Sequence, residues 1–156
     1  MLKKIKSVPA LSKILSGLRS KGKKIVFTNG CFDIMHPGHV VYLDKAKKLG
    51  DILVIGLNSD ASVRKLKGSA RPINSQRARS IVLAALSCVD YVTIFGESTP
   101  ERLVRMLKPA VLVKGGDWKG KEIAGADFVR SCGGRVATIP LVRGFSTTAI
   151  IKKISR

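Results

Sequence analysis

Residues 24–51 decide the fold, and they read KIVFTNGCFDIMHPGHVVYLDKAKKLGD. The apolar, β-branched run at residues 25–27 has the length and composition of a buried strand. A loop follows, and apolar residues then recur at helical spacing at Val40, Leu43 and Ala46 until a glycine ends the segment. The stretch therefore predicts a strand, a tight loop and a helix that opens just beyond two histidines.

The loop of this segment holds the only two histidines of the protein, His36 and His39, around Pro37 and Gly38. The free N–H groups at a helix start attract anions, and a glycine lets the backbone approach a ligand closely. Two imidazoles three residues apart can donate hydrogen bonds to the same phosphate. We therefore favour a phosphate site over two ordinary surface histidines. Zinc is less favoured, because no paired cysteines stand nearby at the usual ligand spacing.

Length and cysteine content restrict the class of protein. The chain has 156 residues, which suits one domain with a full apolar core. No apolar run approaches the roughly 20 residues needed to span a membrane, and the basic N-terminus lacks the apolar core of a signal peptide. The three cysteines are odd in number and far apart, which indicates free thiols in a reducing compartment. We expect a cytoplasmic protein.

The charge of the chain is strongly positive: 29 Lys and Arg against 10 Asp and Glu give a formal net charge of +19. Such a charge would suit a nucleic-acid-binding protein, because clustered cations neutralise backbone phosphates. Here the basic residues are scattered, and the one Trp, two Tyr and five Phe are not interleaved with them. We interpret most of the cations as a solvated surface, with a few facing anionic substrates, and expect no specific nucleic acid and no membrane as partner.

Short apolar segments alternate with helical patterns along the whole chain. The strands are predicted at residues 25–27, 52–57, 91–95, 110–113 and 135–139. Helices are predicted between them, one of them capped by Ser75 with its buried face at Ile81, Val82, Ala85 and Leu86. A last helix is predicted at residues 146–154, after the fifth strand.

This alternation predicts a single-domain α/β fold, a Rossmann-like, doubly wound, parallel five-stranded sheet with helices on both faces. Residues 1–23 would form an N-terminal helix and lead-in that packs outside the main sheet, and residues 24–156 the domain proper. Open sheets of this kind bind ligands at the carboxyl ends of their strands, where the strand order reverses. Every distinctive loop of the chain follows a predicted strand, so these loops can converge there.

A second polar segment, GFSTT at residues 144–148, feeds hydroxyl groups into a helix start. Ser146 can cap that helix, while Thr147 and Thr148 offer donors to a phosphate. Together, TNGCFDIMHPGH and GFSTT resemble the HxGH and ISTT signatures of the nucleotidyltransferase superfamily, which includes cytidylyltransferases and adenylyltransferases. Phe145 stands where that signature carries isoleucine.

Within the superfamily, VKGGDW at residues 113–118, EIAGAD at 122–127 and STTAII at 146–151 resemble the adenylyltransferase of ADP-heptose synthesis. In bacteria that make lipopolysaccharide, that activity is often the C-terminal half of a bifunctional kinase–transferase. The resemblance covers nearly the whole chain from Lys24 onward, so we expect the stand-alone D-glycero-β-D-manno-heptose 1-phosphate adenylyltransferase. Glycerol-3-phosphate cytidylyltransferases share both signatures but carry an arginine a few residues before the second. Here Arg143 directly precedes Gly144, which counts against that alternative.

The resemblance implies transfer of AMP from ATP to a heptose 1-phosphate, with release of pyrophosphate, for lipopolysaccharide core synthesis. It implies catalytic roles for His36, His39, Lys67 and Arg79. It implies nucleotide binding by Asn29, Gly30, Cys31, Phe32, Gly38, Lys114, Gly116, Ser146, Thr147 and Thr148. For the second substrate it implies Asp33, Asp60, Lys65, Asp117 and Trp118. Mg²⁺ would arrive with the triphosphate and need no dedicated protein ligands, and we expect a homo-oligomer, a dimer or larger.

Other classes of protein explain less of the sequence. A cytidylyltransferase or an FAD synthetase of the same fold is the main alternative. A fragment of a class I aminoacyl-tRNA synthetase would also carry a HIGH-type motif, but the sequence contains no KMSKS. A basic nucleic-acid-binding module would account for the charge and leave both signatures unexplained.

Overall fold

A computed structural model describes residues 1–118, 120–142 and 144–154. Its sheet has five strands in the order β3-β2-β1-β4-β5, and every neighbouring pair is parallel. The strands are β1 (Ile25–Gly30), β2 (Ile52–Asn58), β3 (Tyr91–Phe95), β4 (Val111–Gly115) and β5 (Arg135–Ile139). The predicted doubly wound parallel sheet is confirmed. Its strand order reverses between β1 and β4.

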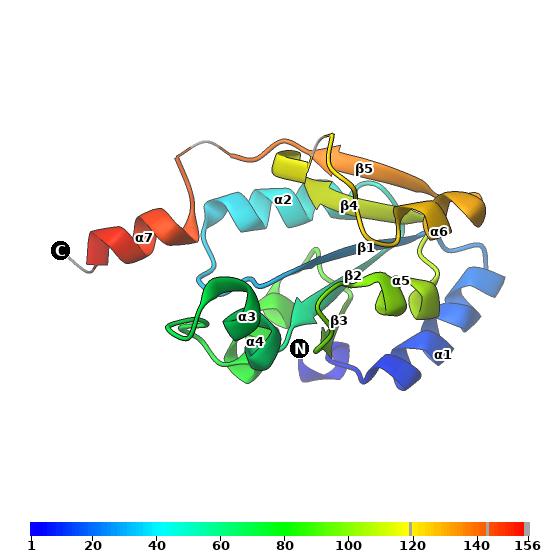
Figure 1. Ribbon diagram of the computed structural model, residues 1–156. Coiled ribbons are helices and arrows are strands. Elements are labelled where there is room, and N and C mark those ends of the chain that lie inside the picture. The colour runs from blue at the N-terminus through cyan, green and yellow to red at the C-terminus, as the bar shows by residue number, and fades with distance from the viewer. Residues whose placement is uncertain (119, 143, 155–156) are drawn as a thin grey trace.

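Helices cover both faces of the sheet (Figure 1). Helices α1 (Val8–Ser20), α5 (Glu101–Leu107) and α6 (Ala126–Ser131) pack on one face, and α2 (Pro37–Lys47) and α4 (Gln76–Ala85) pack on the other. Consecutive strand residues point to opposite faces, so the buried neighbours Val26 and Phe27 belong to different core clusters.

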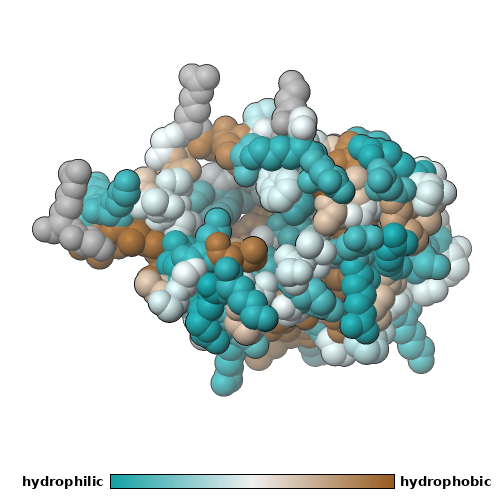
Figure 2. Space-filling model, viewed as in Figure 1, coloured by the Kyte–Doolittle hydropathy of each residue, from teal (hydrophilic) through white to brown (hydrophobic). Residues whose placement is uncertain are grey.

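Four shorter or peripheral elements complete the chain: η1 (Leu2–Lys4), α3 (Asp60–Lys67), η2 (Gly116–Trp118) and α7 (Thr147–Ile154). Helix α7 projects from the body of the molecule beside the start of α2 (Figure 1). None of its side chains is buried, and brown, apolar surface lies at its position in Figure 2. Within the described residues, no helix is both long and apolar enough to cross a bilayer.

The N-terminal lead-in shares the core of the domain. Leu11 and Leu15 of α1 are fully buried against the face of the sheet that α5 and α6 also cover. Ile5 forms a parallel bridge with Val92 at the β3 edge. Residues 1–23 therefore pack against the sheet itself.

The predicted buried face of α4 is wrong at Val82 and Ala85, which are exposed, whereas Leu86 packs against the core. The helix buries Arg79, Ser80, Leu83 and Ala84, while Val82 is 46% exposed. The cause is the Arg79 side chain, whose hydrogen bonds lie in the protein interior and fix the rotation of the helix about its axis. An apolar pattern alone assigns an arginine to the solvent side.

Candidate active site

A pocket of about 400 Å³ lies at the carboxyl ends of β1 and β4, where the strand order reverses. Ligands of open α/β sheets bind at this position. The wall contains Asn29, Gly30, Cys31, Phe32, His36, Gly38, His39, Tyr42, Lys67, Lys114, Gly115, Asp117, Trp118, Leu141, Val142, Phe145, Ser146 and Thr147. The structure thus brings the HPGH and GFSTT segments together, although about a hundred residues separate them.

The two histidines form a stacked pair at the start of α2. The helix begins at Pro37, between them, so His36 is the N-cap residue and His39 lies in the first turn. Their ring centroids are 3.8 Å apart, with an angle of 18° between the ring planes. A Cβ atom at Gly38 would lie 3.0 Å from His36 Nδ1, so a side chain at that position would push the His36 ring aside.

Both imidazoles are neutral in the unliganded protein at pH 7. Burial lowers the pKa of His36, and burial together with the nearby His36 lowers the pKa of His39 to about 4. A neutral imidazole donates one hydrogen bond through its single N–H. The pair can therefore present two donors to an anion.

A buried lysine, Lys114, also lines the pocket. Lys114, at the end of β4, donates to Asn29 Oδ1 on β1 at 2.5 Å, and its Nζ lies 4.8 Å from the centre of the Trp118 ring. Burial lowers the pKa of Lys114 to about 8, against the opposing attraction of Asp117. The side chain therefore carries its positive charge at pH 7. It brings that charge into the pocket with little water around it, where an anion is attracted strongly.

The GFSTT segment places a helix start at the pocket. Ser146 Oγ accepts a hydrogen bond from the Ala149 N–H, as a capping serine does. Thr147 Oγ1 donates to the Ile34 carbonyl at 3.4 Å, which ties α7 to the histidine loop. Ser146 and Thr147 line the pocket, whereas Thr148 is exposed outside its wall.

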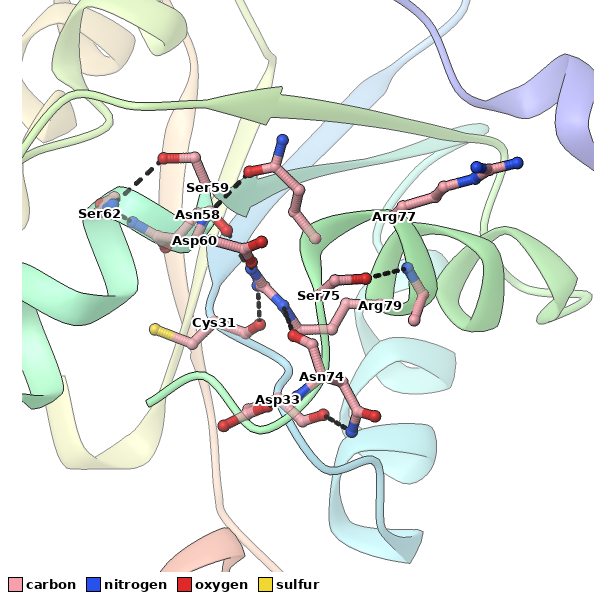
Figure 3. A network of polar contacts seen from close by, with 12 residues as sticks. Cys31, Asp33, Asn58, Ser59, Asp60, Ser62, Asn74, Ser75, Arg77 and Arg79 are labelled. Carbon is pink, nitrogen blue, oxygen red and sulfur yellow. Dashed lines mark hydrogen bonds and ion pairs between the residues drawn. The ribbon is translucent and has the colours of Figure 1, made fainter. Parts of the chain in front are cut away.

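Arg79 lies outside the pocket wall, contrary to its expected catalytic role. Its guanidinium is fully buried and donates to the carbonyls of Cys31, Asn58 and Asn74 and to Asp60 Oδ1 at 2.6–3.0 Å (Figure 3). These bonds join the ends of β1 and β2 to the loop before α4. Asp60, expected to bind substrate, is the ionic partner of Arg79 and also lies outside the pocket wall.

Asp33 likewise has an internal role in place of its expected substrate contact. Its carboxylate accepts from Arg71 Nε and from the N–H groups of Ile73 and Asn74. Burial alone would raise the pKa of Asp33, but the hydrogen bonds from Asn74, Ile73 and Arg71 lower it below its ordinary value. The carboxylate therefore anchors the 71–74 loop beneath the histidine segment.

Two further expected residues lie outside the pocket wall. Lys65 is exposed on α3, whereas Lys67 of the same helix reaches the pocket. Gly116 faces the chain after β5, because a Cβ atom added there would lie 3.3 Å from Pro140 Cα. Its neighbour Gly115 lines the pocket instead. Arg143, whose offset argued against the cytidylyltransferase alternative, lies outside the described residues.

Sequence reasoning missed Tyr42. Its hydroxyl is 2.7 Å from Thr28 Oγ1, and burial raises the pKa of Tyr42 to about 12, so the phenol stays protonated. The available signal was its position three residues after His39, which places both side chains on one side of α2.

Metal-binding side chains are sparse in this region. Among the described residues, no group of three or more His, Cys, Asp and Glu side chains could hold a metal ion. Asp117 is the single carboxylate in the described pocket wall.

Known proteins are similar to this chain along most of its length. The bifunctional protein HldE of Geobacter metallireducens is 58% identical over 153 residues, covering 98% of this chain and 31% of the relative. HldE of Campylobacter concisus is 59% identical over 152 residues, covering 97% of this chain and 31% of the relative. The chain thus spans about a third of the length of these relatives.

Solved structures share the fold. The lipopolysaccharide core biosynthesis protein of Thermoplasma volcanium is 30% identical with a TM-score of 0.64, and the match covers 78% of this chain and 98% of that one. The pantoate-beta-alanine ligase of Francisella tularensis is 14% identical with a TM-score of 0.62, and the match covers 97% of this chain and 76% of that one. At this low identity the match shows a shared fold and nothing more. The cytidylyltransferase-like family matches residues 27–153. The chain therefore belongs to the cytidylyltransferase-like family.

Proposed function

We propose that this protein transfers AMP from ATP to a heptose 1-phosphate, giving ADP-heptose and pyrophosphate. One observation carries the reaction class: the stacked histidines, Lys67, Lys114 and the start of α7 line one pocket at the β1–β4 reversal. These groups are hydrogen-bond donors or cations, and the described wall contains a single carboxylate. Such a wall suits a triphosphate and a sugar phosphate together.

The chemistry needs positioning and charge stabilisation more than proton transfer. An oxygen of the sugar 1-phosphate forms a bond to the α-phosphorus of ATP, and the bond from that phosphorus to the bridging oxygen of pyrophosphate breaks. The attacking phosphate is already ionised at neutral pH, so no general base is required. Neutral His36 and His39 donate hydrogen bonds to the phosphate oxygens, while Lys67 and Lys114 balance the charge that develops on the leaving pyrophosphate.

Mg²⁺ fits this pocket as a companion of the nucleotide. Magnesium keeps most of its waters and takes one or two carboxylates besides phosphate oxygens. Asp117 is the residue placed to approach such an ion from the wall. The bound ion would neutralise part of the triphosphate charge.

The choice of substrates rests on the VKGGDW stretch and on the relatives. This stretch supplies Lys114, Asp117 and Trp118 to the pocket, and Asp117 can accept hydrogen bonds from sugar hydroxyls. The close relatives are named bifunctional proteins, in keeping with a kinase–transferase, and the Thermoplasma volcanium relative is described as a lipopolysaccharide core biosynthesis protein. These features favour ATP and a heptose 1-phosphate over CTP and glycerol 3-phosphate.

We place the reaction in the cytoplasm, since Cys31, Cys88 and Cys132 are all free thiols. A homo-oligomer, a dimer or larger, would cover the exposed apolar side chains of α7.

The test is a matrix of pyrophosphate-release assays with ATP or CTP against heptose 1-phosphate or glycerol 3-phosphate, with mass detection of the product. We expect kcat/KM to be highest for ATP with heptose 1-phosphate, because buried polar groups shaped for one base stay unpaired with another. Higher efficiency with CTP and glycerol 3-phosphate would refute the substrate assignment. Absence of pyrophosphate release from every combination, beside retention of RNA on a filter, would refute the reaction class.

A further inference from the structure

Four aromatic rings form a continuous column across the pocket. Phe32 meets His39 edge to face with centroids 5.3 Å apart, the two histidines stack at 3.8 Å, and His36 is near-parallel to Phe145 at 6.3 Å. The two distances that involve a phenylalanine lie within the range of about 4.5–7 Å typical of interacting aromatic rings, and the two imidazoles are closer still. The column links the histidine loop to the GFSTT segment.

The two ends of the column differ in burial. Phe32 is 7% exposed and belongs to the sheet core, and its backbone has φ +44°, a conformation uncommon for a side chain of this size. Its ring fills the space that a Cβ atom at Gly30 would occupy, at 3.0 Å. Phe145, by contrast, is 46% exposed and comes from the segment between β5 and α7. One end is therefore built into the fold and the other is contributed by the chain before α7.

Within the part of the chain that the structure describes, no hydrogen bond to Nδ1 fixes the orientation of either imidazole. The Nδ1 atoms of His36 and His39 are buried, and neither has a hydrogen-bond partner among the described residues. Functional histidines are usually oriented by such a bond to a carboxylate or a carbonyl. In its place, ring packing holds these imidazoles. A Cβ atom added at Gly38 would lie 3.0 Å from His36 Nδ1 and 3.4 Å from the Phe145 Cβ, so a side chain at that position would crowd both residues.

We propose that Phe32 and Phe145 are positioning residues that clamp the histidine pair from both sides and so hold its N–H donors toward the reacting phosphates. This role rests on the proposed nucleotidyl transfer and adds residues that act through the histidines. The charged side chains that share the described pocket wall with the pair are Lys67 from α3, Lys114 from β4 and Asp117 from η2.

The test uses Phe145→Ala, with Phe145→Tyr as the conservative variant and Val82→Ala as the control. Phe145 is half exposed, so its truncation should leave the fold intact, and Val82 has the same exposed fraction, 46%, on the solvent side of α4. Because the chain has only two histidines, NMR titration gives two imidazole pKa values for each variant without interference. This measurement needs no substrate.

In Phe145→Ala we expect kcat to fall about five- to tenfold, the effect of losing one aromatic contact from an oriented donor. KM for ATP should stay within about twofold, because the donors act on the reacting phosphate rather than on the base. The pKa of His36 should rise toward its ordinary value of 6.5, since burial is what lowers it. Phe145→Tyr should restore both properties, and Val82→Ala should change neither.

Unchanged kcat and unchanged imidazole titration in Phe145→Ala would overturn the clamp. A fall in kcat without any shift in titration, and without rescue by tyrosine, would overturn it as well, since Phe145 would then contact substrate directly. A wild-type protein with no turnover would contradict the proposed function instead, and the titrations would still decide whether the rings hold the histidines.

Discussion

Replacement of Arg79 by methionine tests whether this residue stabilises the fold or binds a phosphate of the substrate. The methionine has a similar length and removes the charge and all the N–H donors. It would leave three backbone carbonyls, those of Cys31, Asn58 and Asn74, without their guanidinium donor, and Asp60 without its ionic partner.

The expected cost follows from these four hydrogen bonds. Removing one member of a buried ion pair typically costs about 3–5 kcal/mol, because the remaining charge and acceptors stay desolvated. Asp60 keeps a quarter of its side-chain surface in solvent and can regain water, which favours the lower end of that range. For a chain of this length, a loss of about 3 kcal/mol lowers Tm on the order of 10 °C.

The assay is thermal unfolding of Arg79→Met beside Arg77→Met, an exposed arginine on the same helix. We expect Arg79→Met to lower Tm strongly and Arg77→Met to leave it almost unchanged. The activity of Arg79→Met, measured well below its Tm, should fall far less than the activity of a histidine variant. An unchanged Tm combined with a loss of kcat greater than about 100-fold, the loss typical of a removed transition-state donor, would refute the structural role and restore Arg79 as a catalytic contact.

Three further outcomes follow from the pocket. His36→Ala and His39→Ala should each lower kcat by roughly 10²–10³, the loss expected when one donor to a transition-state oxyanion is removed. Tm should change little. Near-normal turnover in both variants would contradict the catalytic role of the histidines. The pKa of His39 is about 4 in the folded protein and ordinarily 6.5, so between these pH values the unfolded chain binds a proton that the folded chain does not. The free energy of unfolding should therefore fall as the pH drops from 6.5 to 4. His39→Gln should flatten this dependence in denaturant titrations, and an equally steep fall in that variant would contradict the lowered pKa. Lys114 has a pKa of about 8 and loses its charge above that pH, so kcat/KM for ATP should decline above pH 8. Lys114→Met should lower kcat/KM at pH 7 and abolish the decline. A decline that persists in this variant would assign the titration to another group.

Local sequence was sufficient for the elements and for the layout of the fold. Short β-branched runs bounded by polar turns predicted all five strands, because a buried strand needs only a few consecutive apolar residues between turn residues. The alternation of strands and helices predicted a parallel sheet, since parallel strands require crossover helices. The pairing of the HPGH loop with the GFSTT segment was likewise predictable, because both follow strands whose carboxyl ends share one edge.

Tertiary structure alone decided which polar residues serve the pocket and which serve the fold. Arg79 and Asp33 are as polar as Lys67 and Asp117, yet their partners lie across the fold: Cys31 is 48 residues from Arg79, and Asn74 is 41 residues from Asp33. A charged side chain becomes structural when distant backbone donors or acceptors surround it and remove it from water. Which groups surround a side chain depends on the assembled sheet and loops, and no local pattern of residues records it.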